Sequence, residues 1–193
     1  LGIETWMTGI IITAFSALVI LGGIKSISKA SSVIVPVMAI GYVTGGLIII
    51  LNNLELVMPA LKMIFTYAFT GEAAVGGAIG AAIRYGVARG VFSNEAGMGS
   101  APIAAAAAKT DHPARQGLVS MTGTFIDTII VCSITGIVLV MGFIIAGNSF
   151  GEQTGAVLTI HVFDQLLPGV GGWVVTFGII FFAYSTILGW SYY

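Results

Sequence analysis

Residues 89–109 read RGVFSNEAGMGSAPIAAAAAK. This stretch places an arginine, an asparagine, a glutamate and three glycines inside a chain of 193 residues that is 57% hydrophobic and 8% charged, with a mean hydropathy of +1.04. Soluble domains carry about a quarter charged residues. The composition therefore predicts an integral membrane protein, in which this polar stretch needs a physical reason.

The charged residues and the cysteine exclude several other classes of protein. Seven basic and eight acidic side chains give a net charge of −1, and the only basic cluster is the pair Lys25 and Lys29, which argues against nucleic-acid binding. A single cysteine, Cys132, excludes a disulfide within the chain and a cysteine-rich metal site. The chain does not begin with methionine and ends in the apolar run FFAYSTILGWSYY, so we expect a fragment of a longer protein.

Five segments are predicted to span a membrane, because about 20 apolar residues cross a hydrocarbon layer about 30 Å thick. They form a single transmembrane domain and lie at about residues 5–24, 31–51, 73–109, 117–145 and 170–193. Pro36 is tolerated near the start of the second span, because the N–H groups of an early helical turn are unpaired. The polar residues and Pro59 after this span predict a loop with a short interfacial helix.

The basic residues of short loops predict the orientation, because lysine and arginine favour the cytoplasmic side. Lys25 and Lys29 share one predicted loop, and Lys109 and Arg115 share the loop two crossings later. Both loops should be cytoplasmic. Residues 155–167 have helical spacing of apolar side chains but are too short to cross, so we expect them to form a helix over the extracellular mouth.

The span at residues 73–109 is predicted to be broken near the middle of the membrane. The nine residues 101–109 cover only about half of the bilayer before Lys109 reaches the cytoplasmic surface. Irregular backbone at such depth is tolerated only where it is buried in protein or lines a cavity. Gly97 and Gly99 allow the chain to unwind, and Ser100 suits the N-cap of the second half-helix.

This unwound segment is the predicted substrate site. The N–H groups of the second half-helix favour a carboxylate, and the freed carbonyl groups favour a cation or an ammonium group. Close packing of a glycine-rich helix is the alternative, but packing needs no Asn-Glu pair at a depth where ionisable groups are costly. The candidate substrate-binding residues are Ser93, Asn94, Glu95, Ala96, Gly97, Met98, Gly99 and Ser100.

Three ionisable residues are predicted to converge in the membrane interior. Arg89 precedes Glu95 by six residues, and Asp127 lies about ten residues into its own span. They are candidates for gating or ion coupling. A purely structural ion pair is the alternative, and the sequence leaves both open.

The last span carries a candidate sodium site. Phe182, Thr186 and Trp190 recur every four residues on one helix face, with Ser185 beside them. Two adjacent hydroxyls and the nearby Phe182 carbonyl are hard oxygen ligands suited to sodium, and Trp190 could border a small apolar substrate together with Thr186. Ordinary hydrogen bonds within or between membrane helices are the alternative.

Five segments resemble the sodium:alanine (alanine or glycine:cation) symporter family over essentially the whole chain. They read RGVFSNEAGMGSAP, GGIKSISK, VPVMA, FIDTIIVCSITG and FAYSTILGWSYY. The resemblance implies an all-α membrane protein with a partial leucine-transporter fold, whose first and sixth core helices are broken. The five spans would be core helices four to eight, with residues 93–100 unwound in the sixth and Ser185 and Thr186 holding sodium on the eighth. The first broken helix would lie outside this chain.

The function implied by the resemblance is secondary active transport rather than catalysis. We expect sodium-coupled symport of a small neutral amino acid, alanine or glycine, into the cell, with sodium as the coupling ion. The other expected partners are the lipid bilayer and the remaining helices of the parent, in a prokaryotic plasma or inner membrane. Residues 31–51 hold no lysine, which some proton-coupled relatives of this fold place in the sodium position, so sodium is favoured. A membrane channel, or a structural scaffold with a polar pore, is the alternative.

Overall fold

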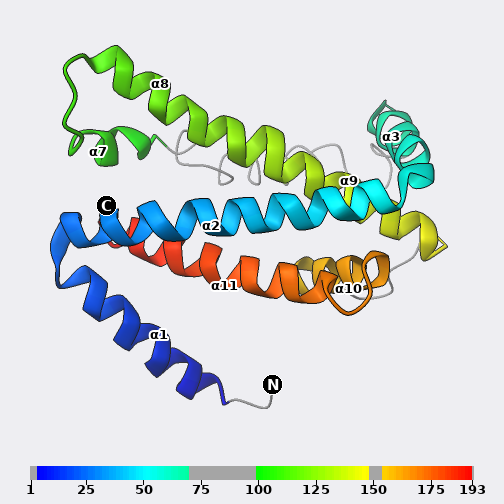
Figure 1. Ribbon diagram of the computed structural model, residues 1–193, viewed down its shortest axis with the longest axis horizontal. Coiled ribbons are helices and arrows are strands. Elements are labelled where there is room, and N and C mark those ends of the chain that lie inside the picture. Colours follow the sequence, from blue (N-terminus) through cyan, green and yellow to red (C-terminus); the bar gives the residue numbers. More distant parts are fainter. Residues whose placement is uncertain (1–3, 70–98, 148–153, 193) are drawn as a thin grey trace.

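The computed structural model describes residues 4–69, 99–147 and 154–192, and in these ranges the regular structure is entirely helical (Figure 1). The all-helical prediction is therefore confirmed for the described residues. The elements are α1 (Thr5–Ile20), α2 (Gly23–Asn52), α3 (Leu54–Phe69), α7 (Ala101–Ala105), α8 (Pro113–Thr124), the π-helical η1 (Phe125–Val131), α9 (Cys132–Ile145), α10 (Gly155–Leu166) and α11 (Gly171–Trp190).

Three helical stretches among the described residues are long and apolar enough to cross a membrane. They are Gly23–Asn52, the continuous run Pro113–Ile145, and Gly171–Trp190, and only 22–28% of their most apolar windows is buried within the protein. The remaining apolar surface suits contact with lipid or with further helices. Helix α1 has 16 residues, or about 24 Å, and is shorter than the span predicted at residues 5–24.

Helix α2 is longer than the sequence predicts, and this changes the setting of Lys25 and Lys29. We expected a loop around these lysines, but the chain turns only at residues 21–22 and α2 begins at Gly23. No proline or glycine follows until Pro36, so nothing interrupts the helix there. Pro36 is consequently deep inside a 30-residue helix, where its missing N–H leaves the carbonyl of Ser32 without its usual helical partner. The early-turn explanation for Pro36 is wrong.

Helix α3 follows α2 with only Asn53 between them, where a loop and a short helix were expected. The Asn53 side-chain amide donates to the Ile49 carbonyl at 2.8 Å and to the Leu166 carbonyl of α10 at 3.4 Å. One side chain thus closes the end of α2 and ties it to α10. The helix then continues through Pro59 for 16 residues, so the loop prediction is wrong here.

The second half of the chain follows the predicted spans more closely. The run α8–η1–α9 begins at Pro113, four residues before the predicted span, and ends at the predicted Ile145. Helix α10 matches the short helix predicted at residues 155–167 to within one residue at its end. Its position relative to a membrane stays a prediction.

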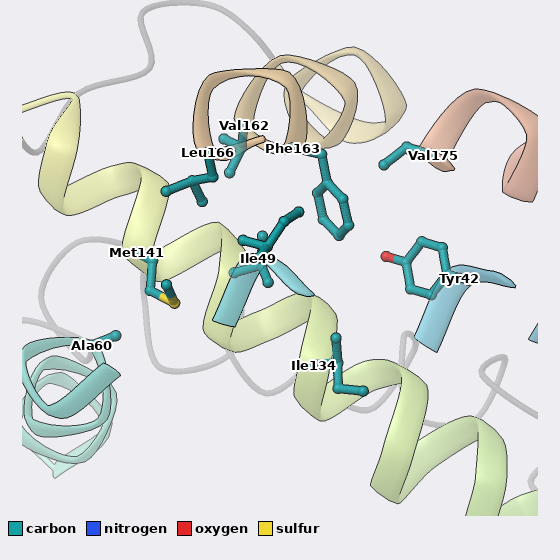
Figure 2. Close-up of a cluster of buried hydrophobic side chains, with 10 residues drawn as sticks. Tyr42, Ile49, Ala60, Ile134, Met141, Val162, Phe163, Leu166 and Val175 are labelled. Atoms are coloured by element: carbon teal, nitrogen blue, oxygen red, sulfur yellow. The ribbon is translucent and has the colours of Figure 1, made fainter. Parts of the chain in front are cut away.

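The buried core lies where α10 packs against α2, α9 and α11 (Figure 2). Phe163 and Val162 of α10, Ile49 of α2 and Val138 of α9 are completely buried. The ring of Tyr42 lies 5.6 Å from that of Phe163, measured between centroids. Close packing of such side chains stabilises this end of the protein.

Two adjacent glycines allow α2 to approach its neighbours closely. A Cβ at Gly45 would lie 2.6 Å from Cγ1 of Val174 on α11, and a Cβ at Gly46 would collide with Ile134 on α9. Small residues bring membrane helices together in this way. The close approach sets the spacing of α2, α9 and α11, the helices that surround the candidate site.

Candidate functional site

Three oxygens predicted to bind sodium converge on one turn of α11. The Ser185 hydroxyl donates to the Phe182 carbonyl oxygen at 3.0 Å, and the Thr186 hydroxyl donates to the same oxygen at 2.8 Å. Such bonds are also the ordinary hydrogen bonds within a helix that the sequence analysis gave as the alternative to a sodium site. Hard cations such as Ca²⁺ and Mg²⁺ take about six or more oxygen ligands, so these residues could form one side of a cation site.

One neighbour of this turn across the helix interface is Met38 of α2. Ser185 Oγ lies 3.9 Å from Met38 Sδ, and Met38 is 8% exposed. A thioether carries no proton at physiological pH and is a weak acceptor. Tyr42 of α2 also packs against the Phe182 ring, so the described α2 side chains at this turn, Met38 and Tyr42, are neither lysines nor carboxylates.

Asp127 lies in η1, where the run from Pro113 to Ile145 departs from α-helical geometry. The segment Phe125–Val131 is π-helical, and such segments occur often at functional sites. The sequence predicted Asp127 as a candidate but not this change of helix type. Periodicity over seven residues cannot distinguish an i→i+5 turn from an α-helical one.

A hydrogen-bonded pair anchors the end of this π-helical segment to the core. Thr135 donates its hydroxyl to the Val131 carbonyl at 2.7 Å, and the Tyr42 hydroxyl lies 2.7 Å from Thr135 Oγ1. Since the one Thr135 proton is used for Val131, Tyr42 is the donor of the second bond. Sequence analysis did not find Tyr42, because its partner is 93 residues away.

A cavity of about 670 Å³ lies between α2 and η1 and reaches α11. It brings together two predicted site residues, Asp127 and Phe182, with Pro36 and Thr44 of α2. The side chains of Asp127 and Thr44 are the polar ones among the described lining residues. An apolar cavity with a few polar groups is typical of small-molecule sites. Thr186 and Trp190 do not line it; both are exposed on α11, Trp190 by 47%.

The structure describes only the end of the predicted unwound segment. Gly99 has a φ of 77°, a conformation that favours glycine. Ser100 occupies the N-cap position of α7, although its side chain makes no capping hydrogen bond. Helix α7 ends at Ala105 rather than reaching Lys109, so the second half-helix is shorter than predicted. The remaining candidates lie outside the described residues: Arg89, Ser93, Asn94, Glu95, Ala96, Gly97 and Met98.

Comparison with protein families places the chain in a known group. The model of the sodium:alanine symporter family matches residues 1–193. The chain belongs to the sodium:alanine symporter family. The resemblance predicted from the sequence motifs is thereby confirmed, and this is a family of transporters rather than enzymes.

Individual members of the sodium:alanine symporter family match the chain over almost all of its length. The sodium/alanine symporter AgcS of Methanococcus maripaludis is 58% identical over 192 residues, which cover 100% of this chain and 42% of AgcS. An uncharacterized transporter of Haemophilus influenzae is 57% identical over 99% of this chain and 42% of its own length. A sodium/proton-dependent alanine carrier protein of Bacillus sp. is 35% identical over 99% of this chain and 45% of its own. The chain thus spans less than half of these relatives.

Proposed function

We propose that the full-length protein containing this chain is a secondary active transporter that couples the inward movement of sodium to that of a small neutral amino acid, alanine or glycine. The observation that carries the proposal is the match of the sodium:alanine symporter family model to residues 1–193, and the Phe182 carbonyl and the Ser185 and Thr186 hydroxyls on one turn of α11 supply oxygens that suit sodium. Membership of the sodium:alanine symporter family supports both the sodium and the class of substrate.

The proposed architecture is the leucine-transporter fold, of which this chain would supply core helices four to eight. The five proposed crossings are the segments predicted from the sequence, with the third broken near residues 93–100. Lys25 and Lys109 line one hollow, at the end of the bundle opposite to α3 and α10 (Figure 1). This arrangement supports a cytoplasmic position for the basic residues and an extracellular position for α10, in a cell membrane.

The proposed coupling ion is sodium, held in part by Phe182, Ser185 and Thr186. Met38 beside Ser185 supports sodium over a mechanism in which a lysine of the neighbouring helix replaces the ion. The names of some relatives mention protons as well as sodium, so the experiment below varies both gradients.

The proposed substrate site combines the unwound segment with two side chains of α11. Residues 93–100 would hold the amino and carboxyl groups of the amino acid, and Thr186 and Trp190 would border its side chain. Arg89, Glu95 and Asp127 would gate or couple this site. The left-handed backbone at Gly99, two residues before the start of α7, supports a break in the helix at this position.

Uptake of labelled alanine by the full-length protein in proteoliposomes tests this proposal. We expect uptake to require an inward sodium gradient, and the sodium concentration for half-maximal uptake to rise about tenfold in Thr186→Ala, equivalent to about 1.4 kcal/mol of lost ion binding. Ser185→Ala should have an effect in the same direction. Thr186→Ser, which keeps the hydroxyl, should restore most of the sodium affinity.

A matched control lies on the same helix. Thr176 donates its hydroxyl to the Gly172 carbonyl at 2.7 Å, the same kind of bond that Thr186 makes ten residues later. Thr176→Ala should leave the sodium dependence unchanged. Unchanged sodium affinity in both Ser185→Ala and Thr186→Ala would disprove the ion assignment, and uptake driven equally well by a proton gradient alone would disprove sodium coupling.

A further inference from the structure

A second hollow, of about 620 Å³, lies at the basic end of the bundle, apart from the candidate sodium site. It is formed by the first turns of α2, by the residues that follow α7, and by the end of α11. Its lining includes Lys25 from α2 and Lys109 from the segment after α7. Two lysines that are 84 residues apart in the sequence thus line one space.

The charge of this hollow is uncompensated among the described residues. Neither Lys25 nor Lys109 makes a hydrogen bond or ion pair there, and no described carboxylate lines the hollow. Asp111, two residues after Lys109, is occupied by Arg115, whose guanidinium lies 2.8 Å from the carboxylate. The hollow therefore favours a ligand with a net negative charge.

The rest of the lining is largely apolar, with a few hydroxyls. Ile24 and Ile27 of α2 and Ala104 of α7 supply apolar walls, and Ser28 and Ser31 supply hydroxyl groups on the same side as Lys25. A free inorganic anion would leave such walls unused. A zwitterionic amino acid would bring an ammonium group that both lysines repel. A phospholipid with a net negative charge fits both the lysines and the apolar walls, since its phosphate is joined to hydrocarbon chains.

We propose that this hollow binds an anionic phospholipid of the cytoplasmic leaflet, with its phosphate between Lys25 and Lys109 and hydrocarbon against Ile24, Ile27 and Ala104. Basic pockets between membrane helices on the cytoplasmic side bind such headgroups. The proposal relies on the orientation given above but not on sodium coupling or on the identity of the substrate.

Thermal unfolding of the purified full-length protein in detergent tests the proposal. Phosphatidylglycerol should raise the unfolding midpoint of the wild type more than phosphatidylcholine does, and the double variant Lys25→Gln/Lys109→Gln should lose this difference. Native mass spectrometry should show one fewer retained phosphatidylglycerol per protein in the double variant. Both measurements are made without sodium or alanine, so a negative result would contradict the lipid site without contradicting the proposed transport function.

Two lysines that do not line the hollow provide matched controls. Lys29 lies one turn from Lys25 on the same helix, and Lys62 lies on α3 at the other end of the bundle. Lys29→Gln and Lys62→Gln should keep the phosphatidylglycerol effect. If Lys29→Gln lost the phosphatidylglycerol effect on the midpoint to the same extent as the double variant, the lipid would be attracted by the basic surface in general, and the proposed site would be wrong. If inorganic phosphate raised the midpoint as much as phosphatidylglycerol does, the ligand would be a free anion rather than a lipid.

Chemical labelling of the lysines in vesicles provides a readout that does not depend on stability. A membrane-impermeant amine reagent applied to inside-out vesicles should label Lys25 and Lys109 less in phosphatidylglycerol than in phosphatidylcholine, with Lys29 labelled equally in both. Labelling of Lys25 and Lys109 that is equally weak in both lipids would mean that another segment of the protein covers the hollow, and would overturn the proposal.

Discussion

The two ends of the helical bundle are built in opposite ways. At the end near α10, Ile49, Met141 and Phe163 are completely buried in one cluster (Figure 2). At the other end, the start of α2, α7 and the end of α11 surround a hollow of about 620 Å³ with exposed lysines. The difference indicates that the packed end holds the helices in register, while the hollow at the basic end lies where dense packing stops.

The largest expected effect is at the packed end, where α10 meets α11. Gly171 is buried, and a Cβ there would collide with the backbone carbonyl of Phe163. Backbone cannot move aside as a side chain can, so Gly171→Ala should destabilise the protein by about 3 kcal/mol. The measurement is the unfolding midpoint of the full-length protein in detergent.

The neighbouring glycine provides the control for this substitution. A Cβ at Gly172 would lie 3.3 Å from Oδ1 of Asp164, a side-chain atom on an exposed residue that can rotate away. Gly172→Ala should therefore change the midpoint little. Equal midpoints for the two variants would contradict the view that the α10–α11 corner fixes the packed end.

A smaller effect is expected for the link between the core and the π-helical segment. Tyr42→Phe removes the hydrogen bond to Thr135, which in turn holds the Val131 carbonyl. The loss should be about 1 kcal/mol, and Thr135→Val should add little to it in a double-mutant cycle, because the two side chains act through one network. Fully additive effects would show that Tyr42 does not act through Thr135.

Tyr184→Phe is the matched control for Tyr42→Phe. The Tyr184 hydroxyl also makes one hydrogen bond, to the Phe15 carbonyl at 3.0 Å, but at an exposed position. That bond lies outside the buried cluster that contains Tyr42, so the substitution should cost less than Tyr42→Phe does.

The smallest effect is expected at the basic end, for the ion pair between Asp111 and Arg115. Its side chains are 68% and 71% exposed, and exposed pairs contribute little because water already solvates both charges. Asp111→Asn should change stability by at most about 0.5 kcal/mol, measured by the same unfolding midpoint. A loss as large as that of Tyr42→Phe would mean that the basic end is also part of the cooperative core.

Several features could be predicted from the sequence because they depend on composition and local pattern. The membrane class follows from the low charge content, and the bounds of α10 and the start of α11 follow, to within one residue, from apolar runs separated by Pro168 and Gly169. The convergence of Ser185 and Thr186 on Phe182 also follows from sequence, because residues three and four apart meet on any helix. The predicted loops at Lys25 and around Pro59 were wrong, because polar and proline residues were taken as helix ends where the helices continue.

What only the tertiary structure decided are the features that join distant parts of the chain. The bond from Tyr42 to Thr135, the cavity shared by Asp127 and Phe182, and the hollow shared by Lys25 and Lys109 each unite residues far apart in sequence. The local sequence pattern determines which face of a helix is polar, but it does not determine which other helix packs against a given face. That choice depends on the close approach that Gly45 and Gly46 allow, and hence on the shape of side chains from other segments.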